Sequence, residues 1–167
     1  MSKRRGFPYA ERAERFRRAQ RVLDDACRHP LFEGREAACD AFWSAAEDAV
    51  PPGFDDAYEQ VKAGDPSGAE LLIGFLEADP FFFRSGYLKA DVAQYLKRAP
   101  LTEAQQERLR RVVVQIVSNR DGREFRRYCH LARALDSPAL REELQGLAVS
   151  QDAAVRRRAE WVLRALA

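Results

Sequence analysis

The chain has 167 residues, of which 46% are hydrophobic and 32% are charged, and its formal net charge is +2. A chain of this length can bury about 70% of the surface that its unfolded form exposes, so it can fold as one domain without disulfides or a metal ion. The composition excludes a disordered or fibrous protein. No apolar run approaches the roughly 20 residues that span a bilayer, so we expect no membrane partner.

The three cysteines indicate a reducing compartment. Cys27, Cys39 and Cys129 are odd in number and scattered, so they match no disulfide framework. The basic N-terminus is followed by charged residues and lacks the apolar stretch of a signal peptide. We therefore expect a cytoplasmic protein.

Charge is distributed unevenly along the chain. Residues 1–32 carry nine basic and four acidic side chains, residues 33–83 carry two and twelve, and residues 84–167 carry seventeen and ten. This pattern either creates a field that attracts a charged partner or lets the acidic middle pair with the basic ends. The sequence leaves both interpretations open.

Helical periodicity accounts for the whole chain, and no segment shows the alternation typical of strands. The first predicted helices cover residues 9–28, 34–50 and 55–63, separated by Pro30 and by the Pro51, Pro52, Gly53 break. A fourth begins at the capping box of Ser67 and Glu70. The fifth ends at Pro100, and its periodic residues are predicted to form the central core: Phe83, Tyr87, Leu88, Val92, Tyr95 and Leu96.

Capping residues mark the remaining helices. Thr102 and Gln105 form a second capping box before the apolar stripe from Leu109 to Val117. The later helices are predicted to begin at these caps: Asp121 with Glu124, Ser137 with Pro138, and Asp152.

The last four helices contain a repeat with a period of 31 residues. A shift by that amount superposes these pairs: Leu109 on Leu140, Val113 on Leu144, Ile116 on Leu147, Val117 on Ala148, Asp121 on Asp152, Leu131 on Val162, and Leu135 on Leu166. A helical hairpin cannot bury both of its faces alone, so stacking of successive hairpins would complete the core.

Residues 140–167 read LREELQGLAVSQDAAVRRRAEWVLRALA, with Asp152, Val155, Arg156, Ala159 and Leu163 in a D..VR..A...L arrangement. This unit is similar to a HEAT-type repeat. The resemblance implies an α-solenoid hairpin in which the aspartate and arginine help to pack neighbouring turns, and in which the second helices line a concave binding face.

The predicted fold is therefore all-α: stacked antiparallel helical hairpins in a HEAT-like α-solenoid or α-α superhelix. We expect a single domain over residues 1–167, with a helical N-terminal half (1–100) and HEAT-like hairpins (101–167). Residues 1–100 lack the motif, so a compact helical bundle stays open for that half.

The sequence contains no pattern of a catalytic, cofactor or metal site. It lacks a phosphate-binding glycine loop, an H-E-x-x-H helix and a G-x-S-x-G elbow. The cysteines and histidines, Cys27, His29, Cys39, Cys129 and His130, match no recurrent zinc spacing. We expect a protein that is not an enzyme and binds no cofactor.

Arginines recur on successive C-terminal helices and could align as a basic stripe when the hairpins stack. The candidate partner-binding residues are Arg126, Arg127, Arg156, Arg157 and Arg158, with Arg110 and Arg111 beside them. The leading hypothesis is a module that binds a protein partner through its second helices.

Nucleic acid is the alternative partner of this stripe. HEAT-like alkylpurine DNA glycosylases hold damaged duplex on such a scaffold, which makes Trp161 or Tyr128 a conceivable stacking residue. Trp161 adjoins an apolar stripe, however, and such a position is more typical of core packing. Arginine is also abundant throughout, as expected from a GC-rich genome.

Overall fold

The protein is helical throughout the part of the chain that the computed structural model describes, residues 7–29, 34–120 and 122–167, and these residues contain no strand. The helices are α1 (Tyr9–Arg28), α2 (Arg35–Glu47), α3 (Phe54–Lys62), the 3₁₀ turn η1 (Pro66–Gly68), α4 (Ala69–Ala78), α5 (Ser85–Leu96), α6 (Glu103–Asn119), α7 (Phe125–Ala134), α8 (Pro138–Ala148) and α9 (Ala153–Leu166). The all-α prediction is confirmed. Within the same residues, no helix combines the length and apolar character needed to cross a membrane.

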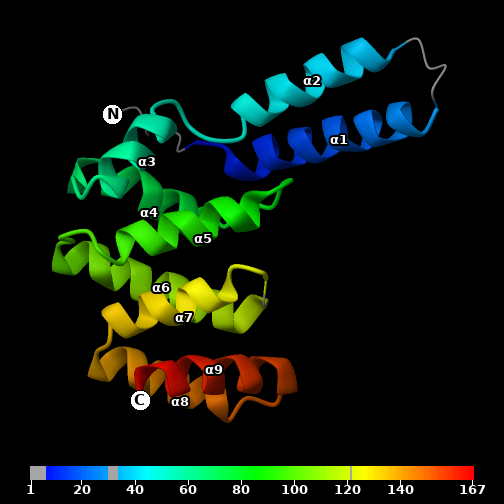
Figure 1. Ribbon diagram of the computed structural model, residues 1–167. Helices are drawn as coiled ribbons and strands as arrows, with labels where there is room; N and C mark the ends of the chain where they lie inside the picture. Colours follow the sequence, from blue (N-terminus) through cyan, green and yellow to red (C-terminus); the bar gives the residue numbers. More distant parts are fainter. Residues whose placement is uncertain (1–6, 30–33, 121) are drawn as a thin grey trace, which may run out of the picture.

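The helices follow one another from one end of the molecule to the other (Figure 1). Helices α1 and α2 lie side by side at the N-terminal end, and α1 also contacts α4. Beyond them, α4, α6 and α8 contact one another in turn, and so do α5, α7 and α9. Contacts of α4 with α5, α6 with α7, and α8 with α9 join these two rows.

Three of the predicted helix starts are confirmed by their hydrogen bonds. Thr102 and Gln105 form a complete capping box on α6. The Ser137 hydroxyl accepts from the backbone N–H of Leu140, and the Asp152 carboxylate accepts from two N–H groups of α9. Each of these side chains satisfies a donor that the helix itself leaves unpaired.

The capping box of Ser67 and Glu70 is wrong. Ser67 lies inside η1, where its backbone N–H donates to the Asp65 carboxylate, and α4 begins only at Ala69. Glu70 forms an ion pair with Arg108 of α6. The predicted cap Asp121 lies outside the described residues, whereas Glu124 precedes α7 without capping it by a side-chain hydrogen bond.

The core is a continuous cluster of apolar side chains from all of these helices. The predicted stripe of α6 is fully buried, with Leu109, Ile116 and Val117 no more than 2% exposed. The prediction for the fifth helix is only partly right. Val92 and Leu96 are buried, but Phe83, in the segment before α5, and Tyr87 are 47% and 52% exposed.

The acidic middle of the chain pairs with both basic ends, as one of the two charge interpretations requires. Arg12 and Arg15 of α1 bind Asp48 after α2. Arg108 of α6 binds Glu70 and Glu77 of α4. This pairing is incomplete, because within the described residues Arg84, Arg123, Arg126 and Arg133 form no ion pair.

Replacing Leu144 by alanine is expected to lower the free energy of unfolding by about 2–5 kcal/mol, because its side chain is fully buried and the substitution leaves a cavity. Chemical denaturation measures the difference. Val149→Ala is the control: Val149 is 77% exposed, so its loss should change stability by less than about 0.5 kcal/mol. Equal effects of the two substitutions would contradict the packing of α8.

Candidate functional site

A buried network of charges joins α4, α5, α6 and α7. Lys89 of α5 is fully buried, and its ammonium lies 2.6 Å from a carboxylate oxygen of Asp79, the residue that ends α4. Arg120, at the end of α6, binds Asp79 and also Glu124, at 2.6 Å. The two cations and two carboxylates balance, so the network carries no net charge into the core.

The network is packed tightly enough to constrain its neighbours. Burial lowers the pKa of Lys89, and the adjacent Asp79 carboxylate opposes that shift. Glu124 is 3% exposed, and a Cβ atom at Gly122 would lie 2.3 Å from its carboxylate, so a larger residue at this position would displace the Glu124 side chain. The hydroxyl of Tyr128 is buried beside the network and has no hydrogen-bond partner among the residues that the structure describes, and burial raises its pKa.

Helices α5, α7 and α9 carry a series of hollows that share residues with one another. One hollow lies between α5 and α7, another between α7 and α9, and a third at the ends of α5 and α7. Tyr87 and Arg123 connect the first of these to a cleft beside α1. We call the surface around them the basic–aromatic face; it comprises Phe81, Phe83, Arg84, Tyr87, Lys97, Arg123, Arg126, Arg127, His130, Arg133, Arg157 and Trp161.

Positive charge prevails on this face, although Asp24, Asp91 and Glu124 also line its hollows. Among the described residues, no carboxylate lies within ion-pair distance of Arg84, Lys97, Arg123, Arg126 or Arg133. Three arginines of α6 and α8 differ, whereas Arg111 of α6 is exposed. Their ion pairs are Arg108 with Glu77 at 2.7 Å, Arg110 with Glu103 at 2.6 Å, and Arg141 with Asp136 at 2.6 Å.

Exposed aromatic side chains lie among these arginines. Phe81 is 64% exposed and Trp161 is 39% exposed, in addition to Phe83 and Tyr87. A guanidinium group covers each ring: Arg17 on Phe81, Arg84 on Phe83, Arg123 on Tyr87, and Arg157 on Trp161, at 5.1 to 5.9 Å from the ring centres. These cation–π contacts hold the rings at the surface.

The five predicted arginines divide into two groups. Arg126, Arg127 and Arg157 are exposed on the basic–aromatic face. Arg158 is only 5% exposed and donates to the carbonyl oxygen of Val117 at 2.7 Å, so the prediction that it binds a partner is wrong. Arg156 is half-buried and donates to the carbonyls of Ser150 and Gln151, which stabilises the turn before α9.

Several residues of the face were not predicted as candidates, namely Phe81, Phe83, Arg84, Tyr87 and Arg123. The periodicity of the fifth helix assigned its aromatic residues to the core, and Phe82, between the two exposed phenylalanines, does lie there. A usable signal was Arg84 directly after three phenylalanines, since a charge at that point marks where the chain returns to the surface.

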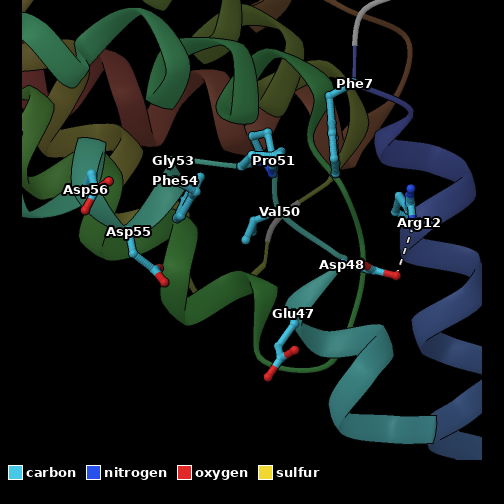
Figure 2. A pocket seen from close by; sticks show the side chains of 11 residues that line it. Phe7, Arg12, Glu47, Asp48, Val50, Pro51, Gly53, Phe54, Asp55 and Asp56 are labelled. Carbon is cyan, nitrogen blue, oxygen red and sulfur yellow. Dashed lines mark hydrogen bonds and ion pairs between the residues drawn. The ribbon is translucent and has the colours of Figure 1, made fainter.

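Another hollow, of about 410 Å³, lies between the start of α1 and the start of α3, and its rim is acidic (Figure 2). Asp48 turns toward Arg12, with which it forms the ion pair described above, whereas Glu47 and Asp55 point elsewhere. Among the described residues, no group of three or more histidine, cysteine or acidic side chains could hold a metal ion.

The described cysteines and histidines form no nucleophilic pair. All three cysteines are free thiols, and burial raises the pKa of Cys129, which disfavours the reactive thiolate. His130 faces the hollow at the ends of α5 and α7. Partial burial lowers its pKa, and the nearby charges of Lys97, Arg126, Arg127 and Arg133 lower it further.

Arg158→Met is expected to destabilise the fold by about 1–3 kcal/mol, because the carbonyl oxygens of Val117 and Ser118 lose their donor. Thermal or denaturant unfolding measures this change. Arg126→Met is the matched control, since Arg126 is exposed and its loss should cost less than about 0.5 kcal/mol. A small effect for both would show that Arg158 does not secure α9 to α6.

The double variant Arg126→Gln, Arg127→Gln is expected to raise the pKa of His130, because it removes two positive charges that disfavour protonation. An NMR titration of the imidazole signals measures the shift, and His29→Gln assigns them. Arg111→Gln serves as the control on α6. An unchanged His130 pKa in the double variant would show that the α7 arginines do not act on this site.

The chain matches no protein-family model, no curated protein and no solved structure. Its function must therefore be argued from its own residues. Among the described residues of the basic–aromatic face, arginines without an ion-pair partner lie on α7 and in the turns before α5 and α7, next to exposed aromatic side chains of α5 and α9, and such a combination is a feature of binding surfaces.

Proposed function

We propose that the protein is a cytoplasmic, non-enzymatic α-solenoid module of HEAT-like hairpins that binds an acidic protein partner through its basic–aromatic face. One observation carries the proposal. Arg108 and Arg110 of α6 and Arg141 of α8 are neutralised by carboxylates, whereas among the described residues Arg84 before α5, Arg123 before α7, and Arg126 and Arg133 of α7 have no ion-pair partner and lie on a face with exposed aromatic rings.

Two equivalent hydrogen bonds support the repeat. Arg110 at the middle of α6 donates to the carbonyl oxygen of Leu135 at 2.9 Å, and Arg141 of α8 donates to that of Leu166 at 2.7 Å. Both donors and both acceptors are 31 residues apart, the period found in the sequence. In each hairpin the first helix thus satisfies a carbonyl left unpaired at the end of the second helix.

Equivalent burial supports the same register. Leu109 and Leu140 are both essentially buried, as are Val113 and Leu144. Contacts of α6 with α8 and of α7 with α9 relate one hairpin to the next. In a solenoid of this kind the second helices form one continuous surface, which here is the row of α5, α7 and α9.

The composition of the face favours a protein as the partner. Protein interfaces are enriched in aromatic residues and arginine and depleted in lysine. Lys97 is the single lysine among the residues that define the face, which otherwise combines arginine with phenylalanine, tyrosine and tryptophan. Charge complementarity makes an acidic partner the best fit.

Nucleic acid is the second candidate, favoured by the row of arginines on α7. Phosphates would bind such a row, and bases could stack on exposed rings. The structure of the C-terminal helix counts against it, since Arg156 and Arg158 donate to backbone carbonyls. One side of each exposed ring is also occupied by a guanidinium group.

Site-specific photo-crosslinking in extracts of the source cells tests this function. A photoreactive residue at Trp161 is expected to crosslink to a protein, because that position is exposed on the face. The same residue at Gln145, exposed on α8, should not. Adding Arg123→Glu and Arg126→Glu should weaken the crosslink by about tenfold, since each reversal sets like charge against an acidic partner.

Nuclease treatment of the extract separates the two candidates. A crosslinked product that keeps its mass after nuclease treatment and is digested by protease supports a protein partner. A product that nuclease removes favours nucleic acid. Equal crosslinking at Trp161 and Gln145, unaffected by the charge reversals, would rule out a partner-specific face.

A further inference from the structure

The cleft beside α1 differs from the other hollows of the basic–aromatic face in its aromatic walls. It has a volume of about 530 Å³ and lies between α1, the segment before α5, and the junction of α6 with α7. Phe81, Phe83 and Tyr87 line it together with arginines that include Arg84 and Arg123. A hollow of this size holds one large side chain with its flanking backbone.

The aromatic walls are fixed in place. Phe82 is buried against Phe16 of α1, with ring centres 5.5 Å apart, and its backbone N–H donates to the hydroxyl of Ser85 at 3.1 Å. Arg84 has a left-handed backbone with φ of 64°. Because Phe82 points into the core and the chain turns at Arg84, the side chains of Phe81 and Phe83 point outward. Their exposure therefore follows from the backbone conformation of this segment.

The charges of the cleft favour an anionic ligand. Arg84 and Arg123 have no carboxylate within ion-pair distance among the described residues. Glu124 also lines the cleft, but its carboxylate is engaged by Arg120. Asp24 of α1 lines the cleft as well, but five arginines outnumber the two acidic residues there, so an anion that enters meets the guanidinium groups of Arg84 and Arg123 in a net positive surrounding.

The basic residues continue from the cleft along one side of α7. Arg126, His130 and Arg133 are spaced three or four residues apart, so they lie on one stripe of α7, and Arg123, in the turn before the helix, lines the same hollow as Arg126 and His130. From Arg123 to Arg133 these residues extend over roughly 15 Å, at 1.5 Å per residue. An extended peptide covers that length with about five residues.

We infer that the cleft binds one large apolar side chain of an acidic linear segment in the partner, while carboxylates of that segment lie along Arg123, Arg126 and Arg133. This inference rests on the proposed function and specifies its partner. A peptide fits better than a nucleic-acid strand, because guanidinium groups already cover one side of the Phe83 and Tyr87 rings on which bases would stack.

Fluorescence anisotropy with synthetic peptides tests the inference on the full chain. The probe is an eight-residue labelled peptide with one tryptophan flanked by glutamates. Replacing its tryptophan by alanine, or its glutamates by glutamine, should weaken binding by about tenfold in either case, because each change removes one of the two recognised features. A single-stranded oligonucleotide of equal charge should bind more weakly at physiological salt.

Variants of the protein locate the binding site. Phe83→Ser and Arg123→Gln should each weaken binding of the tryptophan peptide by about tenfold. The matched controls are Val149→Ser, at the end of α8, and Arg111→Gln, on α6. Both residues are exposed outside the cleft, so these substitutions should leave binding unchanged. Thermal unfolding of each variant establishes that the fold is intact.

Each of the other outcomes overturns the inference. If the alanine peptide binds as tightly as the tryptophan peptide, the cleft is not the anchor, although loss of binding in Arg126→Gln, Arg127→Gln would preserve the proposed function. If no peptide binds, the inference that the partner contributes an acidic linear segment is wrong. Crosslinking at Trp161 then decides whether the basic–aromatic face still has a partner. Tighter binding of the oligonucleotide than of the peptide would assign the cleft to nucleic acid. Self-association of the protein that Arg123→Gln abolishes would assign the cleft to a second copy of the chain.

Discussion

The buried ammonium of Lys89 is the constraint on which the rest of the structure depends. A cation in the core is tolerated only when a carboxylate meets it with good geometry, and loss of either partner leaves an uncompensated charge. Asp79 satisfies Lys89 from the end of α4, and Arg120 then links Asp79 to Glu124 at the start of α7. Four helices are thereby fixed relative to one another at a single point.

The same network determines the charge of the surface. Asp79 and Glu124 lie close in sequence to Arg84 and Arg123, but they form no ion pair with those two arginines. Both carboxylates turn inward instead, toward Lys89 and Arg120. Within the described part of the chain, Arg84 and Arg123 therefore have no carboxylate at ion-pair distance. The positive field of the basic–aromatic face is thus a consequence of how the core is closed, and not only of arginine content.

Much of the fold could be predicted from local signals, because capping depends on a few neighbouring residues. Thr102, Ser137 and Asp152 act as the sequence indicates. The site could not be predicted in the same way. Periodicity identifies one side of a helix without showing whether another helix covers it. Phe83 and Tyr87 were therefore assigned to the core although they are exposed, and Arg158 was assigned to the surface although it is buried.

The backbone of Asp79 has a practical consequence for protein engineering. Asp79 ends α4 in the left-handed conformation, with φ of 43°, where glycine is normally the most favourable residue. A design rule that replaces such residues by glycine would relieve the backbone and simultaneously strip Lys89 of its counter-charge. At position 79 glycine would suit the backbone conformation but would leave the buried Lys89 without its carboxylate partner. Backbone preference and core electrostatics must therefore be considered together.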